Sequence, residues 1–119
     1  MQRQGETKSN NLSLNQANFT RVKNIFRELI ENKVKTIILV GSGGNGKSYL
    51  MNLCSNQIQL NNYMVFEEID INVPTNSFIY FLDSLPDKKI LHFHYNPLTR
   101  HNVTLPTNSV IIDMNHIRF

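Results

Sequence analysis

The sequence predicts a three-layer α/β domain with a short, mainly parallel sheet and a β-hairpin. Two apolar runs, Thr36–Val40 (TIILV) and 109–114 (SVIIDM), have the composition of strands buried on both faces of a parallel sheet. A glycine-rich segment follows the first run directly, and amphipathic helical patterns lie on both sides of it. Because a chain of 119 residues holds one modest core, we expect a single domain over residues 19–119.

The charge balance is mildly basic, with 12 Lys plus Arg against 9 Asp plus Glu. The densest basic group, within 21–35, is interrupted by Glu28 and Glu31, which indicates a solvated helix face rather than a nucleic-acid-binding patch. No apolar run approaches the roughly 18 residues of a membrane span, and the single cysteine, Cys54, has no disulfide partner. We therefore expect no membrane partner and a cytoplasmic location, which is the host cytoplasm if the asparagine-rich composition reflects a viral source.

The N-terminal part of the chain predicts a tail and then a helix. Residues 1–18 have too few apolar side chains to offset the entropy of ordering, so we expect a disordered polar tail. From residue 19 to about residue 33, apolar side chains recur at three- and four-residue steps, which predicts an amphipathic helix capped by Asn18 or Thr20. The buried strand Thr36–Val40 follows.

The middle of the chain predicts a second helix, a second strand and an ambiguous segment. One apolar stripe after the glycine-rich segment indicates a helix that ends near Asn61 and places Cys54 in the core. Residues 63–71 predict a strand that becomes acidic toward its end. Residues 75–85 fit a buried strand or a helix. Two parallel neighbours need a crossover of about a dozen residues, and the gap from Ile71 to Phe78 is too short for one. We therefore favour a helix that is itself the crossover.

Residues 90–96 alternate, with His92 and His94 on one face, and predict the first arm of an exposed β-hairpin whose second arm contains Val103 and Leu105. The buried strand at 109–114 comes next. The two histidines share a strand face, but a structural zinc site needs about four ligands, so we expect no zinc.

The most specific feature is the phosphate-loop motif G-x-x-x-x-G-K-[ST], which lies between a predicted buried strand and a predicted helix. It is matched at every required position by Gly41, Ser42, Gly43, Gly44, Asn45, Gly46, Lys47 and Ser48. Glycines let successive backbone N–H groups point at one set of phosphate oxygens. Lys47 can reach the β- and γ-phosphates, and the Ser48 hydroxyl can take one position around Mg²⁺. The motif therefore predicts binding of ATP or GTP with Mg²⁺, against the alternative of a merely glycine-rich turn.

Carboxylates at strand ends are candidates for the remaining roles. Asp113 ends the last apolar run and is the first candidate for the metal, with Asp83 as its rival if 78–82 is a strand. Asp70, at the end of the second strand, is the candidate catalytic base, with Glu67 and Glu68 as back-ups. Ordinary solvated acids at strand ends remain the alternative for each of them.

The phosphate loop has the Walker A arrangement of P-loop nucleoside triphosphatases, and the chain from Ile37 to Ile117 resembles the uridine kinase family. This resemblance implies a catalytic base at Asp70, a substrate-pocket aromatic at Tyr95, a substrate contact at Arg100 and a metal-side acid at Asp113. The chain departs from the family at Asn45, which replaces a serine, and at Asn96, which replaces an aspartate. The family's arginine-bearing lid would lie beyond residue 119.

A second resemblance is to superfamily 3 helicases and related AAA+ ATPases. It implies that 78–83 is the Walker B strand ending in Asp83 and that Asn96 is the polar sensor of the next strand. Ser84 stands where that family has a water-activating glutamate.

The sequence therefore supports three hypotheses about function. The first is an enzyme that transfers a phosphoryl group from ATP or GTP to a small hydroxyl acceptor such as a nucleoside, with Lys47 and Asp70 as catalytic residues. The second is a helicase-like ATPase that acts on nucleic acid in an oligomer or with a partner chain. The third is a non-catalytic nucleotide-binding domain.

Overall fold

The structure is a computed structural model that describes residues 10–13, 18–41, 46–69, 80–94 and 107–115. Along the chain, its helices and strands are β1 (Asn10–Ser13), α1 (Phe19–Glu31), β2 (Thr36–Val40), α2 (Lys47–Leu53), α3 (Ser55–Leu60), β3 (Met64–Ile69), β4 (Lys89–Phe93) and β5 (Ser109–Asp113). A further helical turn covers residues 80–83. Within these ranges none of the helices has the length and apolar character that crossing a bilayer requires.

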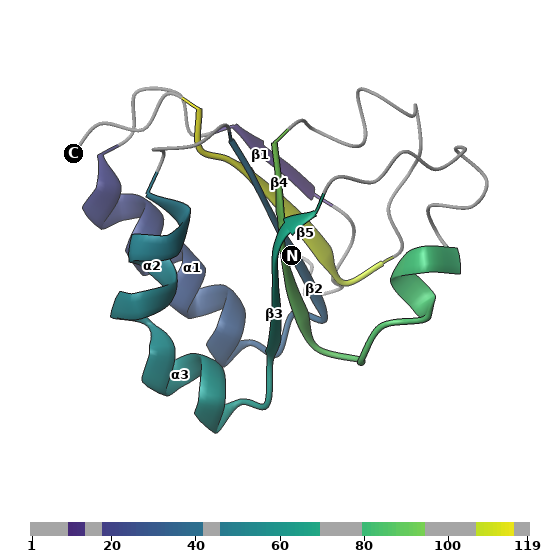
Figure 1. Ribbon diagram of the computed structural model, residues 1–119. Helices are drawn as coiled ribbons and strands as arrows, with labels where there is room; N and C mark the ends of the chain where they lie inside the picture. The colour runs from purple at the N-terminus through teal and green to yellow at the C-terminus, as the bar shows by residue number, and fades with distance from the viewer. Residues whose placement is uncertain (1–9, 14–17, 42–45, 70–79, 95–106, 116–119) are drawn as a thin grey trace, which may run out of the picture.

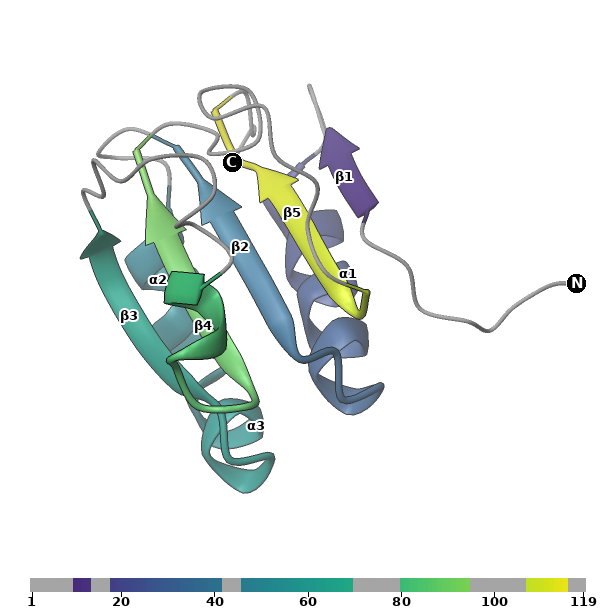
Figure 2. The same ribbon diagram turned by 90° about the vertical axis from the view of Figure 1, so that its right-hand side faces the viewer.

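The strands form one sheet in the order β1-β5-β2-β4-β3, and every neighbouring pair is parallel. Their arrowheads in Figure 2 consequently point to the same edge. At that edge Val40 of β2 lies opposite Phe93 of β4 on one side and Asp113 of β5 on the other. The prediction of an α/β fold on a mainly parallel sheet is confirmed.

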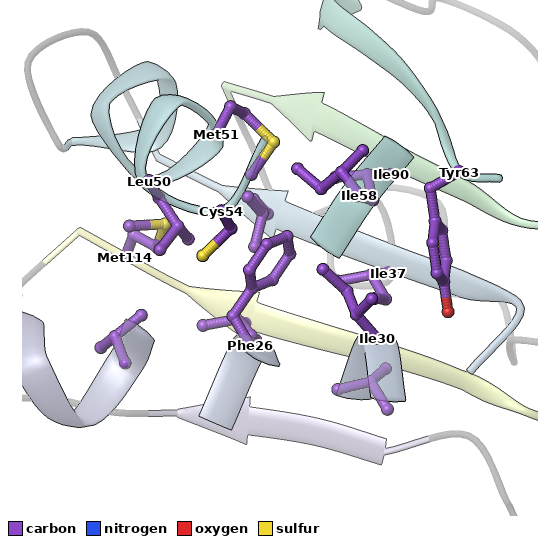
Figure 3. Packing of buried hydrophobic residues seen from close by; sticks show 14 of the residues in the cluster. Phe26, Ile30, Ile37, Leu50, Met51, Cys54, Ile58, Tyr63, Ile90 and Met114 are labelled. Carbon is purple, nitrogen blue, oxygen red and sulfur yellow. The ribbon is translucent and has the colours of Figure 1, made fainter. Parts of the chain in front are cut away.

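Successive side chains of a strand point to opposite faces of the sheet, and both faces are covered. On one face, Ile37 and Leu39 of β2 belong to a core cluster with residues of α1, α2 and α3 (Figures 1 and 3). On the other face, Ile38 and Val40 pack in a second cluster around Leu82 of the turn at 80–83. The continuous apolar run of β2 therefore reflects burial on both sides.

Helix α1 forms as its sequence pattern predicts. Its buried side chains, Phe19, Val22, Phe26 and Ile30, recur at three- and four-residue steps and face the sheet. Asn18 caps its start, since the Asn18 side chain accepts a hydrogen bond of 2.8 Å from the backbone N–H of Arg21. The stripe after the glycine-rich segment forms two short helices, α2 and α3, which meet at Cys54. Cys54 is a core thiol, as expected, and burial raises its pKa.

The prediction of an exposed hairpin at 90–96 is wrong for β4. This strand pairs in parallel with β2 and β3, so both of its edges are occupied and no antiparallel arm can pair with it. The difference comes from His92. The alternating pattern predicts that it faces solvent, whereas it is 0% exposed and the whole strand is buried. Val103 and Leu105 of the expected second arm lie outside the described residues.

The helix favoured within 75–85 is confirmed for the part that the structure describes. Residues 80–83 are helical, and the N–H of Ser84 donates to the carbonyl of Tyr80 at 3.0 Å. The alternative strand at 78–82 is therefore wrong for its described end, and Asp83 does not end a strand.

The polar N-terminal segment also differs from the expectation of a disordered tail. Its residues Asn10–Ser13 form β1, which pairs in parallel with β5 at the edge of the sheet. The expectation rested on the small number of apolar side chains. Pairing at a sheet edge satisfies backbone N–H and carbonyl groups, and it does not require an apolar segment.

Candidate functional site

The candidate site lies at the edge of the sheet where the parallel strands end. In open α/β sheets, ligands bind outside the carboxyl ends of the strands. Here β2 leads into the phosphate-loop motif, and β5 ends beside it because Asp113 is in register with Val40. The N–H of Met114 donates to the Val40 carbonyl at 2.7 Å, which holds the chain after β5 against the start of the loop.

Gly41 and Lys47 tie the two ends of the phosphate-loop motif together. The N–H of Gly41 donates to the Phe93 carbonyl at 2.9 Å, which fixes the start of the loop against β4. Lys47 is only 6% exposed, and its amine donates a hydrogen bond to the carbonyl of Gly41. The Lys47 amine is thereby held beside the first residue of the motif. Residues 42–45 lie outside the described residues.

Gly46 gives the chain the turn from which α2 starts. Its φ angle is 87°, in the left-handed region, where a Cβ atom would cost about 1–2 kcal/mol. The Gly46 carbonyl accepts a hydrogen bond of 2.9 Å from the N–H of Leu50, the first of the helix. The glycine that the motif requires before Lys47 is thus the residue this backbone conformation favours.

Ser48 contacts an acidic side chain of β3. Its hydroxyl donates to Oε1 of Glu67 at 3.2 Å, and both residues are exposed. Val65 packs against the cluster beneath α1, α2 and α3, and Glu67 follows it by two residues, where the register of β3 with β4 shifts. In the sequence, two-residue alternation groups Glu67 with Val65 but does not say which face of the strand meets the helices. Glu67 is therefore predicted from the sequence only as a back-up for the base.

Asp113 occupies the predicted strand end but has different partners. Its Oδ1 accepts hydrogen bonds from the backbone N–H of Asn115 at 2.9 Å and from the Asn115 side chain at 3.0 Å. These bonds hold the carboxylate at the end of β5, next to β2. Ser48 is bonded on the β3 side instead. Ser48 and Asp113, the predicted metal ligands, are therefore not bonded to each other: Ser48 is bonded to Glu67 and Asp113 to Asn115.

Most of the remaining predicted site residues lie outside the described ranges, whereas His94 lies within them. Asp70, Tyr95 and Arg100 lie outside them, as do Glu68's side chain and Asn96. His94 follows β4 directly, is exposed and adjoins Phe93, whose carbonyl binds Gly41. The alternating pattern predicts a hairpin at His94 and gives no indication that it lies at this edge of the sheet.

His92 and His94 do not form a metal centre with other ligands in the part of the chain that the structure describes. Within it, no group of three or more His, Cys, Asp or Glu residues is arranged to hold a metal ion. His92 is buried within β4, whereas His94 is exposed beyond its end.

Comparison with known proteins gives no match to this chain, whether with protein-family models, curated proteins or solved structures.

Proposed function

We propose that this chain binds a nucleoside triphosphate, ATP or GTP with Mg²⁺, at residues 41–48, and transfers its terminal phosphoryl group to a small hydroxyl acceptor such as a nucleoside. One observation carries the proposal. A complete phosphate-loop motif joins a buried central strand of a parallel sheet to a helix, with the Lys47 amine held at the carbonyl of Gly41.

The residues present fit a magnesium–nucleotide complex. Ser48 and Glu67 supply hard oxygen donors 3.2 Å apart, which is the ligand type that Mg²⁺ prefers. When bound, Mg²⁺ neutralises charge on the β- and γ-phosphates. Lys47 stabilises the negative charge of the same oxygens, and Gly46 keeps the backbone free of a Cβ atom at the start of α2.

The acceptor side of the proposal rests on the resemblance to the uridine kinase family. Asp70 follows β3 as the candidate base, and Tyr95 and Arg100 follow β4 as candidate acceptor contacts. In sequence, all three follow strands whose carboxyl ends lie at the same edge of the sheet as that of β2, and all three lie outside the described residues. Transfer of a phosphoryl group to a hydroxyl needs a base and acceptor contacts, and these residues are proposed for those roles.

The structure removes one support from the helicase-like alternative. That interpretation requires a Walker B strand ending in Asp83, and residues 80–83 are helical. Nothing in the described residues offsets this loss of support, so the acceptor is proposed to be a small molecule.

The test is a calorimetric titration with ATP and with GTP, in the presence of Mg²⁺, of the wild type and of Lys47→Ala. Hydrogen bonds to charged groups contribute about 1.5–3 kcal/mol, so we expect Lys47→Ala to weaken binding by about tenfold to a hundredfold. Because Lys47 is buried, Lys47→Met, which keeps the aliphatic stem, is measured in parallel.

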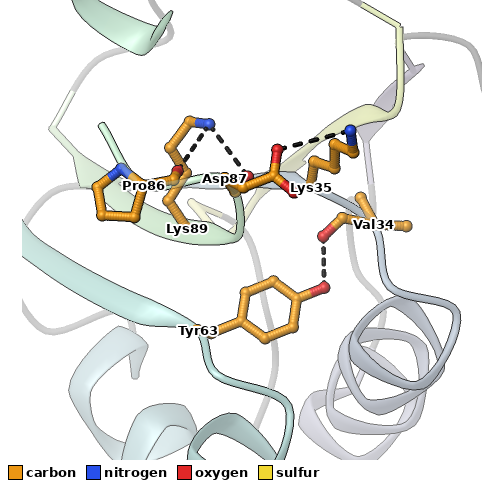
Figure 4. A network of polar contacts seen from close by, with 6 residues as sticks. All are labelled: Val34, Lys35, Tyr63, Pro86, Asp87 and Lys89. Atoms are coloured by element: carbon orange, nitrogen blue, oxygen red, sulfur yellow. Dashed lines mark hydrogen bonds and ion pairs between the residues drawn. The ribbon is translucent and has the colours of Figure 1, made fainter. Parts of the chain in front are cut away.

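Lys35→Ala is the matched control. Lys35 precedes β2, at the opposite edge of the sheet, and its exposed amine pairs with Asp87 at 3.5 Å (Figure 4). It should bind nucleotide as the wild type does. Absence of binding by the wild type, or equal affinity of the wild type and both Lys47 variants, would refute nucleotide binding at this loop.

The reaction class is tested separately, by release of ADP. We expect a nucleoside to stimulate release if the chain is a phosphotransferase. Stimulation by DNA or RNA alone, rising steeply with protein concentration, would instead establish the helicase-like alternative.

A further inference from the structure

We infer that Glu67, and not Asp113, is the acidic partner of Ser48 in holding the divalent cation. This inference rests on the proposed function, because it assigns a residue to the metal side of the same nucleotide site. It changes the sequence-based assignment, in which Asp113 had the metal role and Glu67 was a back-up for the catalytic base.

The first argument is the contact itself. The hydroxyl of Ser48, the motif residue that binds the cation, donates to Oε1 of Glu67 at 3.2 Å. Neighbouring oxygens in an octahedral magnesium shell, with metal–oxygen distances of 2.0–2.1 Å, are about 3 Å apart. The two oxygens thus already have nearly the separation that adjacent ligands of one Mg²⁺ require.

The second argument is the shape of β3. Its register with β4 shifts between Phe66 and Ile69, where three steps along β3 match the two steps from Leu91 to Phe93. The extra residue lies at the position of Glu67 and its successor. Irregularities of this kind re-aim side chains next to functional sites, and this one coincides with the side chain that reaches Ser48.

The third argument is that Asp113 is held elsewhere. It ends β5, on the opposite side of β2 from β3, and its Oδ1 accepts two hydrogen bonds from Asn115. Ser48 is drawn to the β3 side of the loop. Each carboxylate therefore has its own position, and Glu67 occupies the one beside the hydroxyl.

The experiment measures how much Mg²⁺ strengthens ATP binding. ATP is titrated into the full chain in EDTA and in excess Mg²⁺, for the wild type, Glu67→Gln and Asp113→Asn. We expect Glu67→Gln to lose about tenfold or more of the gain in affinity that Mg²⁺ gives the wild type. In EDTA it should bind ATP at least as tightly as the wild type, because a carboxylate that repels polyphosphate has been removed.

Two further measurements separate a metal ligand from a structural residue. Binding of Mn²⁺ in the presence of ATP, followed by electron paramagnetic resonance, should weaken in Glu67→Gln and recover in part in Glu67→Asp. The double variant Ser48→Ala/Glu67→Gln should lose no more of the Mg²⁺ gain than the larger single loss, since both residues act on one cation. Circular dichroism checks that the variants are folded, which the exposure of Glu67 favours.

The outcomes distinguish this inference from the function on which it rests. If the wild type does not bind ATP in either condition, the proposed function fails and the inference fails with it. If the wild type binds and Glu67→Gln keeps the full Mg²⁺ gain, only the inference is overturned. Loss of that gain in Asp113→Asn alone would return the metal role to Asp113.

Discussion

Tyr63 joins two turns at the edge of the sheet opposite the phosphate loop. Tyr63 lies between α3 and β3, and Val34 lies between α1 and β2. The Tyr63 hydroxyl donates a hydrogen bond to the Val34 carbonyl (Figure 4). The side chain is 6% exposed, and burial raises the pKa of Tyr63 to about 12. One hydrogen bond therefore links the turn before β3 to the turn before β2, and it depends on a neutral hydroxyl.

Tyr63→Phe removes this bond and leaves a buried carbonyl without its donor. We expect it to lower the free energy of unfolding by about 1–2 kcal/mol at pH 7, measured by urea denaturation. Because the folded-state pKa is raised above 10, the contribution is complete below pH 10 and is lost as the pH rises through 12. The stability difference between variant and wild type should therefore shrink over this interval.

Two comparisons make the measurement specific. Burial lowers the pKa of Lys89, which affects stability in an overlapping pH range, but equally in both proteins, so that it cancels in the difference. Tyr80→Phe changes a tyrosine that is 77% exposed and should leave stability unaltered. A difference for Tyr63→Phe that stays constant up to pH 12 would contradict the prediction.

At the residue level, the motif predicts a role for Lys47 but does not predict that Glu67 contacts Ser48. The role proposed for Lys47 follows from local spacing, because the phosphate-loop motif is continuous in sequence. The contact between Ser48 and Glu67 joins α2 to β3 and depends on which face of β3 looks toward the helices. That face is decided by packing over α1, α2 and α3, which a single strand's sequence does not specify.

At the level of elements, spacing predicts helices better than it predicts the burial of strands. The capping residue and apolar stripe of α1 are local, and both were predictable. β4 was not, because the strands beside it and the groups that cover its two faces come from distant parts of the chain. His92 interrupts its apolar run, so a fully buried strand has the alternating pattern of a half-exposed one.

The cap of α1 can be tested directly. Asn18→Ala removes the side-chain oxygen that accepts from the N–H of Arg21, and we expect a loss of about 1 kcal/mol in the free energy of unfolding. Asn18→Asp keeps an acceptor and should retain the stability. Asn24→Ala, at an exposed position within the same helix, should cost nothing, because alanine has the higher helix propensity. Equal stability of Asn18→Ala and Asn24→Ala in urea would refute the capping role.

For the whole molecule, the sheet order places the phosphate-loop strand in the interior. β2 lies between β4 and β5, and both of its neighbours end at its carboxyl end. The metal hypothesis for Asp113 requires β5 to lie beside this strand, and the structure pairs the two, although the sequence left their adjacency open. The sequence did not predict β1, since edge pairing uses backbone groups that every residue carries. Burial of β2 and the hydrogen bonds of Val40 and Gly41 to Met114 and Phe93 fix the point at which the motif begins.

The burial of β2 requires that both faces of the sheet are covered, and Leu82 tests the face that packs in the second cluster. Leu82 is 1% exposed and packs, from the turn at 80–83, on Ile38 and Leu91 in the second cluster. We expect Leu82→Ala to lower the free energy of unfolding by about 2–5 kcal/mol, as for other buried leucines. Tyr80→Ala, on the same turn but exposed, should change it by less than about 0.5 kcal/mol. If urea denaturation gave the two variants the same stability, the turn would not cover this face, and β2 would be supported from the helical side alone.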